Sequence, residues 1–147
     1  MLKMSPKEKR QARISALQAI YAQELTGSKP EVTYKHMLEK NHIPNNKVLE
    51  YGKHLCQLTF QYTPEMDILI QNRLKNWDFE RITLMDKLIL RMAIAEMLYE
   101  KDVPPKVSIT EGVEIAKQFS TTDSSSFING ILDSVYNDMV KGKVKTE

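Results

Sequence analysis

The chain has 147 residues, of which 41% are hydrophobic, 27% are charged and only five are glycine, so its composition is that of an ordinary globular domain and not of a disordered chain. No apolar run approaches the roughly 20 residues that a membrane helix needs, and the charged N-terminal stretch lacks the apolar core of a signal segment, so we expect a cytoplasmic protein without membrane contact. Cys56 is the single cysteine, which excludes an intrachain disulfide.

The net charge of +2 is distributed unevenly along the chain. The first 13 residues and the residues from Lys141 onward are basic, and the body between them is acidic. We therefore expect one domain over residues 1–147, with a flexible basic arm at about 1–8 and a frayed tail at about 141–147. The basic arm either holds a polyanion or is only a solvated terminus, and charge alone leaves both interpretations open.

Almost every periodic segment has the spacing of a helix, which predicts an all-α fold. The first helix is expected to begin at Ser5-Pro6 and to end at Thr26-Gly27, since a capping residue followed by proline starts helices and glycine ends them. Its inward stripe is Ile14, Leu17, Ile20, Tyr21 and Leu25. A short helix near 34–38, one over about 48–60 and one from Thr63-Pro64 to about residue 75 follow.

The segment 84–99 is apolar nearly all round, which predicts a central, buried helix. Ser108 and Glu111 fit a capping box and place the start of the next helix there. A polar run over 120–126 separates that helix from the last one, for which Asp123 is the expected cap. Gly130 lies inside the last helix, where glycine costs about 1 kcal/mol relative to alanine, and this predicts close approach of a neighbouring backbone.

The sequence carries no pattern that indicates catalysis. Its three histidines are scattered, its glycines are isolated and form no phosphate-binding loop, and nothing places two carboxylates in a shared apolar cleft. We therefore expect no enzyme activity, no metal site and no cofactor.

Two blocks of sequence carry more than a generic helical pattern. The first is Arg10-Gln11-Ala12-Arg13 leading into residues 16–27. The second runs from Asn76-Trp77 through residues 81–98, 103–117 and 126–133, and includes Val107-Ser108-Ile109-Thr110-Glu111 and Ser126-Phe127-Ile128-Asn129-Gly130. Together these blocks resemble the bacterial transcription antitermination factors of the NusB family over more than half of the chain.

The resemblance implies an all-helical fold of two three-helix halves that has no catalytic activity. It implies binding to single-stranded boxA RNA of ribosomal RNA leader transcripts, jointly with the small-subunit ribosomal protein NusE, within a complex on RNA polymerase that resists termination. Whether the free protein is a monomer or a homodimer stays open. The alternatives are a helical scaffold for proteins alone, a ribosome-assembly adaptor, or an accessory domain like that fused to ribosomal RNA methyltransferases.

The matched family positions, together with the basic arm, give the candidate RNA-binding residues. On a helix, Lys9, Arg10 and Arg13 lie within one arc of about 100°, so they can face a phosphate backbone together. The candidate RNA-binding residues are Lys7, Lys9, Arg10, Arg13, Tyr21, Lys117, Asp123, Phe127 and Asn129. Tyr21 and Phe127 either stack on bases or pack in the core, and Asn129 either contacts RNA or ties two helices together.

The resemblance also implies that Glu80 and Asp86 bind the protein partner, because an acidic surface complements a basic ribosomal protein. Solvated carboxylates with no partner are the alternative. Arg91 can pair internally with Asp86, so it is not assigned to the interface. The chain departs from the family in two ways: lysine and Glu8 dilute the arginine cluster of the first helix, and Gly112 stands where alanine is expected.

Overall fold

The computed structural model describes residues 3–29, 32–36, 46–75 and 78–144. Every regular element in these ranges is helical, which confirms the predicted all-α fold class. The chain divides into two compact units, Met1–Gln61 and Tyr62–Glu147. None of the helices in the described ranges is long and apolar enough to cross a membrane.

Helix α1 (Pro6–Thr26) of the first unit has the ends that the sequence predicted. Ser5 caps it: the Ser5 hydroxyl accepts the Glu8 N–H at 3.1 Å, and the Glu8 carboxylate accepts the Ser5 N–H at 3.0 Å. The helix ends at Gly27, whose φ of 74° is the left-handed conformation that glycine adopts without strain. Both ends are therefore fixed by signals within a few residues of chain.

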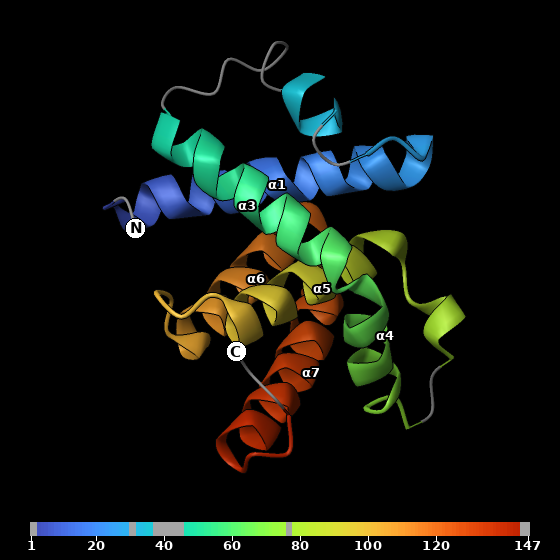
Figure 1. Ribbon diagram of the computed structural model, residues 1–147. Coiled ribbons are helices and arrows are strands. Elements are labelled where there is room, and N and C mark those ends of the chain that lie inside the picture. Colours follow the sequence, from blue (N-terminus) through green and yellow to red (C-terminus); the bar gives the residue numbers. More distant parts are fainter. Residues whose placement is uncertain (1–2, 30–31, 37–45, 76–77, 145–147) are drawn as a thin grey trace. The chain divides into compact units, whose positions relative to one another are not determined.

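Helix α1 packs against α3 (Asn46–Gln61), and residues 32–36 form a further helical turn (Figure 1). The contact uses small residues, since Ala12 and Ala16 are fully buried. Gly52 of α3 lies under the ring of Tyr34, and a Cβ there would overlap the Tyr34 hydroxyl. Leu25, which was predicted to point inward, is 64% exposed, so the apolar stripe ends before it.

The interior of the first unit also holds the chain's cysteine. The Cys56 thiol lies 3.6 Å from the carbonyl oxygen of Ala16, to which it donates. Burial raises the pKa of this thiol to about 12, and it also raises the pKa of Tyr34. Both groups therefore keep their protons at neutral pH.

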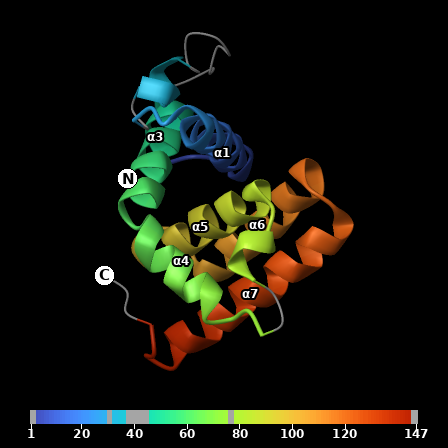
Figure 2. The ribbon, with the colours of Figure 1, turned by 90° about the vertical axis from the view of Figure 1, so that its right-hand side faces the viewer.

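The second unit is built around α5 (Leu84–Tyr99), which packs against α4 (Thr63–Gln71), α6 (Pro105–Phe119) and α7 (Thr122–Val140), as Figures 1 and 2 show. In the residues that the structure describes, this unit contains the α-helices α4 to α7 and a short 3-10 helix, η1 (Phe79–Arg81). Most of α5 is buried on all sides, which confirms the predicted central helix. The guanidinium of Arg91 pairs with both carboxylate oxygens of Asp67, at 2.7 and 2.9 Å, and so joins α5 to α4.

Two predicted helix starts in this unit are wrong. Helix α6 begins at Pro105, a proline at the first helical position, and Ser108 lies one turn inside it, fully buried, where its hydroxyl donates to Glu96 at 2.7 Å. Helix α7 is capped by Thr121, whose hydroxyl accepts the Ser124 N–H at 3.0 Å, and Asp123 stands in its first turn. In both cases the start is set by a residue other than the one whose capping chemistry the sequence suggested.

Helix α7 ends in a glycine motif that turns the chain back. Gly142 has a φ of 72°, its N–H donates to the carbonyl of Met139, and the N–H of Lys143 donates to the carbonyl of Asp138. This pair of hydrogen bonds fixes the direction in which the chain leaves the helix as far as residue 144.

Candidate nucleic-acid interface

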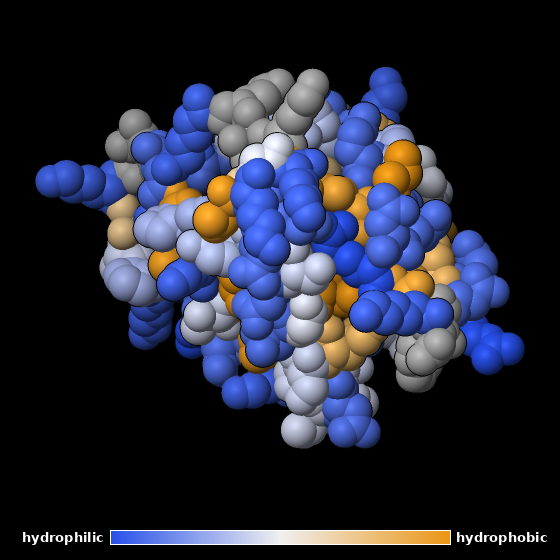
Figure 3. All heavy atoms as spheres, turned by 90° about the horizontal axis from the view of Figure 1, so that it is seen from below, coloured by the Kyte–Doolittle hydropathy of each residue, from blue (hydrophilic) through white to orange (hydrophobic). Residues whose placement is uncertain are grey.

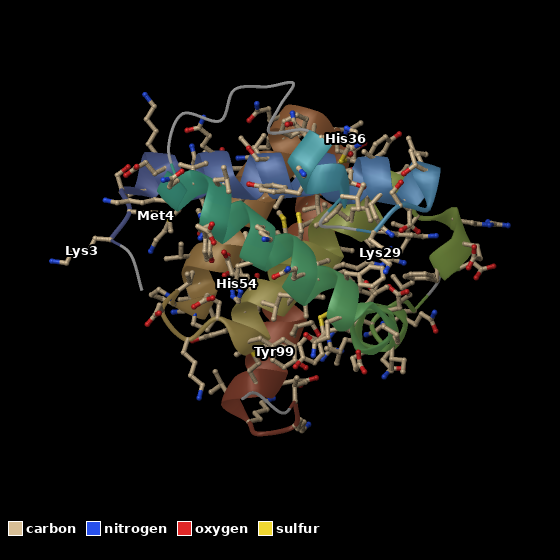
Figure 4. The ribbon with its side chains drawn as sticks, turned by 45° about the horizontal axis from the view of Figure 1, so that its top comes forward. Lys3, Met4, Lys29, His36, His54 and Tyr99 are labelled. Atoms are coloured by element: carbon tan, nitrogen blue, oxygen red, sulfur yellow. The ribbon has the colours of Figure 1, made fainter. Side chains whose placement is uncertain are left out.

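The basic side chains at the start of α1 differ in exposure: some are accessible to solvent and one is buried. Lys7 and Arg10 are exposed and Lys9 is half-buried. Lys3 precedes them and extends from the chain before the helix begins (Figure 4). Arg13 is only 3% exposed, so the structure does not present its guanidinium with the others on one phosphate-facing arc. The exposed cationic surface is therefore smaller than the helical spacing predicted.

Tyr21 lies further along α1 and is half-buried. A half-buried ring has one part in the core and another within reach of solvent, so its position is compatible with both interpretations left open by the sequence.

In the second unit, three of the candidate residues border a common hollow. Asp86, Asp123 and Phe127 line a recess of about 280 Å³ at the starts of α5 and α7, together with Arg81. Phe127 is half-buried, so part of its side chain is open to solvent, where a base can stack on an aromatic ring. The structure thus brings together residues from the RNA-binding and the partner-binding predictions.

The two acidic candidates of this unit differ in accessibility. Glu80 of η1 has a side chain that is 81% exposed and lies 4.0 Å from the ammonium group of Lys87. Asp86 is only 5% exposed, and its carboxylate accepts the hydroxyl hydrogen of Ser120 at 2.8 Å. Glu80 can meet a partner directly, whereas Asp86 joins the start of α5 to the end of α6.

The remaining candidates lie on exposed surfaces. The Lys117 ammonium lies 3.3 Å from the Glu114 carboxylate on the same helix, a surface pair of small energetic consequence. Asn129 is exposed and its side chain forms no hydrogen bond to another described residue, so it does not tie two helices together. Gly130, predicted to meet a close backbone, would place a Cβ with no atom within 4 Å, and that prediction is wrong.

No metal site is found in the parts of the chain that the structure describes. His36 and His54, both in the first unit, lie on separate helical segments (Figure 4).

A second hollow in the same unit contains residues that the sequence did not single out. Its volume is about 770 Å³, and it lies between the end of α4 and α7, which lines it from Ser126 to Asp138. Arg73, Lys75 and Lys143 line it, with Asp138 as the acidic member, and Phe127 and Gly130 belong to the same lining. Arg73, Lys75, Asp138 and Lys143 come from separate segments of chain, and no local pattern marks them.

Comparison with known proteins now identifies the chain. A model of the NusB family matches residues 10–137. The chain belongs to the NusB family. The transcription antitermination protein NusB of Chloroherpeton thalassium is 41% identical over 135 residues, which make up 92% of this chain and 64% of that protein. NusB of Treponema pallidum (strain Nichols) is 40% identical over 128 residues, which make up 86% of this chain and 91% of that protein.

The fold matches NusB structures as well. A chain in the crystal structure of the antitermination factors NusB and NusE in complex with dsRNA superposes with a TM-score of 0.82 at 25% identity, covering 90% of this chain and 98% of that one. Membership in the family confirms the resemblance read from the sequence. It assigns the chain to the transcription antitermination proteins, a non-catalytic family.

Proposed function

We propose that this chain is a transcription antitermination factor that binds boxA-type RNA of ribosomal RNA transcripts jointly with the ribosomal protein NusE. The observation that carries the proposal is the match over 90% of the chain to a structure of NusB and NusE in complex with dsRNA. The complex would act on RNA polymerase in the cytoplasm, where a bacterial transcript is made.

The charge and aromatic features of the two units support the RNA part of the proposal. Lys7 and Arg10 expose positive charge at the start of α1, and phosphate contacts of this kind supply most of the affinity for a nucleic acid. Phe127 offers a half-buried ring, and stacking of a base on such a ring is the usual way in which proteins hold single-stranded RNA.

The partner part is supported by Glu80. Its carboxylate is almost fully exposed on η1, where it can meet a basic ribosomal protein. Asp86 has a structural role next to this surface, because its hydrogen bond with Ser120 fixes the first turn of α5.

A protein-only scaffold is the second candidate, and the burial of Arg13 favours it. With Arg13 inside and Lys117 beside Glu114, the exposed positive charge available for phosphates falls below the family pattern. Phosphate binding has a salt dependence that protein docking through an apolar surface lacks, and this difference separates the two candidates.

The test is binding of the full chain to a boxA RNA and to a scrambled RNA of equal composition, at two salt concentrations, with and without NusE. We expect preferential binding to boxA RNA that weakens as salt rises and strengthens when NusE is present. Lys7→Gln should lower the slope of log K against log salt by about 0.7, the value for one phosphate contact on a single strand. Lys53→Gln, which removes an exposed lysine from α3, is the matched control and should leave the slope unchanged. Equal binding of both RNAs under every condition would favour the scaffold.

A further inference from the structure

Gly130 lies inside α7, and no feature of the fold requires a glycine there. Its φ is not among the positive values found at Gly27 and Gly142, so alanine could adopt the same backbone. A Cβ at this position would meet no atom within 4 Å, so no neighbouring element needs the space either. Alanine would stabilise the helix, and the glycine therefore lowers stability without a packing reason. Gly130 is one of the residues that line the 770 Å³ hollow, and a side chain at this position would project into open space there.

The walls of this hollow are held in place by contacts at the ends of α4 and α7, which lie beside each other in Figures 1 and 2. The Arg73 guanidinium donates to the carbonyl of Leu69 at 2.9 Å and to the carboxylate of Asp138 on α7. The Arg73 side chain is 9% exposed and that of Asp138 is 33% exposed, so this partly buried ion pair joins the segment that follows α4 to α7. The charge of Asp138 is thereby matched by Arg73.

With Arg73 and Asp138 matched, the excess charge of the hollow is that of two lysines. Lys75 follows the turn after α4 and is exposed. Lys143 is exposed as well, and it is placed by the hydrogen bond from its N–H to the carbonyl of Asp138 in the glycine motif that ends α7. Two cations from opposite ends of the unit's sequence therefore border one recess, which suits a polyanion.

Phe127 separates this recess from the smaller one. The same side chain lines the 770 Å³ hollow with Lys75 and Lys143, and the 280 Å³ hollow with Asp86 and Asp123. The smaller hollow carries two carboxylates beside one cation, Arg81, whereas the larger hollow carries two unmatched lysines. The phosphates of an RNA strand that stacks a base on Phe127 are therefore attracted toward the larger hollow. The charges thus select the hollow over α7 as the path of the backbone.

We propose that the hollow lined by Gly130, Lys75 and Lys143 binds one nucleotide of the RNA, next to the base at Phe127, with its backbone phosphates held by the two lysines. This inference rests on the proposed function, because it assigns a subsite to the same RNA. The volume of about 770 Å³ falls in the range of pockets that bind small organic ligands, so a nucleotide fits. The glycine lets the nucleotide approach the α7 backbone.

On the face of the molecule that Figure 3 draws, hydrophilic side chains predominate and apolar ones show as separate patches between them. No broad apolar docking surface is seen on that face.

The test uses the full chain, a fluorescently labelled boxA RNA and a salt titration. We expect Lys75→Gln/Lys143→Gln to lower the slope of log K against log salt by about 1.4, corresponding to two phosphate contacts on a single strand. Lys101→Gln, which removes an exposed lysine of the same unit outside the hollow, is the matched control and should not change the slope. Gly130→Gln fills the recess at an exposed helix position and should weaken binding without lowering the melting temperature. Gly130→Ala should raise the melting temperature and weaken binding less.

The outcomes separate this inference from the proposed function. If the unchanged protein does not prefer boxA RNA, the proposed function fails. If it does, and both the lysine pair and Gly130→Gln bind as the parent does, the hollow is not a nucleotide site while the proposed function stands. The same holds if these variants retain RNA binding and lose only NusE, since the hollow would then receive protein.

Discussion

Gly52 in the first unit and Gly130 in the second both lie inside helices, where glycine is unfavourable, and their surroundings are opposite. Over Gly52 the hydroxyl of Tyr34 occupies the place of a Cβ, and the carbonyl oxygen of Ala12 lies 3.2 Å from that place. Over Gly130 there is open space within 4 Å. The first glycine is required by packing within the chain, whereas no packing contact requires the second, which borders the proposed nucleotide site. The same residue type thus distinguishes a structural helix contact from a candidate binding surface.

Gly52→Ala is the substitution with the largest expected effect, and it tests whether packing requires the glycine in the first unit. The new methyl group would overlap the Tyr34 hydroxyl, and overpacking of this kind costs about 1–3 kcal/mol in the free energy of unfolding. Urea unfolding followed by circular dichroism measures the loss. An unchanged or raised stability would show that Tyr34 moves aside freely, and the contrast with Gly130 would disappear.

Tyr34→Phe provides the control for this prediction. The Tyr34 hydroxyl is buried without a hydrogen-bond partner in the described residues, so its removal should cost little. Since the shortest contact of the new methyl is to that hydroxyl, Tyr34→Phe should recover part of the stability that Gly52→Ala loses. A double variant as unstable as the sum of the two single ones would assign the loss to another contact.

The closed interior of the first unit also predicts a dependence of stability on pH. Burial raises the pKa of Cys56 from its ordinary value of 9.0 to about 12, so between these values the unfolded chain releases a proton that the folded chain keeps. Stability is therefore fully present below pH 9 and falls as the pH rises toward 12, by up to about 1.4 kcal/mol per pH unit. Unfolding curves at about pH 8 and about pH 10 should show this decrease, and Cys56→Ala should show a smaller one. Parallel pH profiles for the two proteins would contradict the burial of a neutral thiol.

The elements that could be predicted from the sequence are those whose signals are local. Ser5, Pro6 and Gly27 fix the ends of α1 within a few residues, and the apolar character of 84–99 fixes the central helix. Ser108 shows the limit: its spacing to Glu111 fits a capping box, yet its hydroxyl is used by Glu96 on another helix. A local pattern cannot reveal a partner that tertiary packing supplies.

The candidate site was predictable only in part for the same reason. Helical geometry placed Arg13 on the arc of Lys9 and Arg10, but the buried side of α1 is set by the small residues that meet α3, and Arg13 is buried. The hollow was not predictable, because Lys75, Gly130 and Lys143 border one recess only through the Arg73–Asp138 ion pair and the glycine turn that ends α7.

Gly112 of α6 sharpens the comparison because its surroundings are intermediate between those of the other two glycines. A Cβ there would lie 3.1 Å from a methyl carbon of Leu132 and 3.3 Å from the Cβ of Ala93, contacts that are tight without being an overlap like that at Gly52. The gain of about 1 kcal/mol from alanine in a helix and the cost of the tight contacts nearly cancel, so Gly112→Ala should change the free energy of unfolding by less than about 1 kcal/mol. Leu132→Val shortens the side chain in contact, and a double-mutant cycle should therefore show a favourable coupling between the two substitutions. An absence of coupling, together with a loss of stability as large as that of Gly52→Ala, would mean that α6 cannot move away from Ala93 of α5. The spacing of the helix backbones would then decide where these units need glycine.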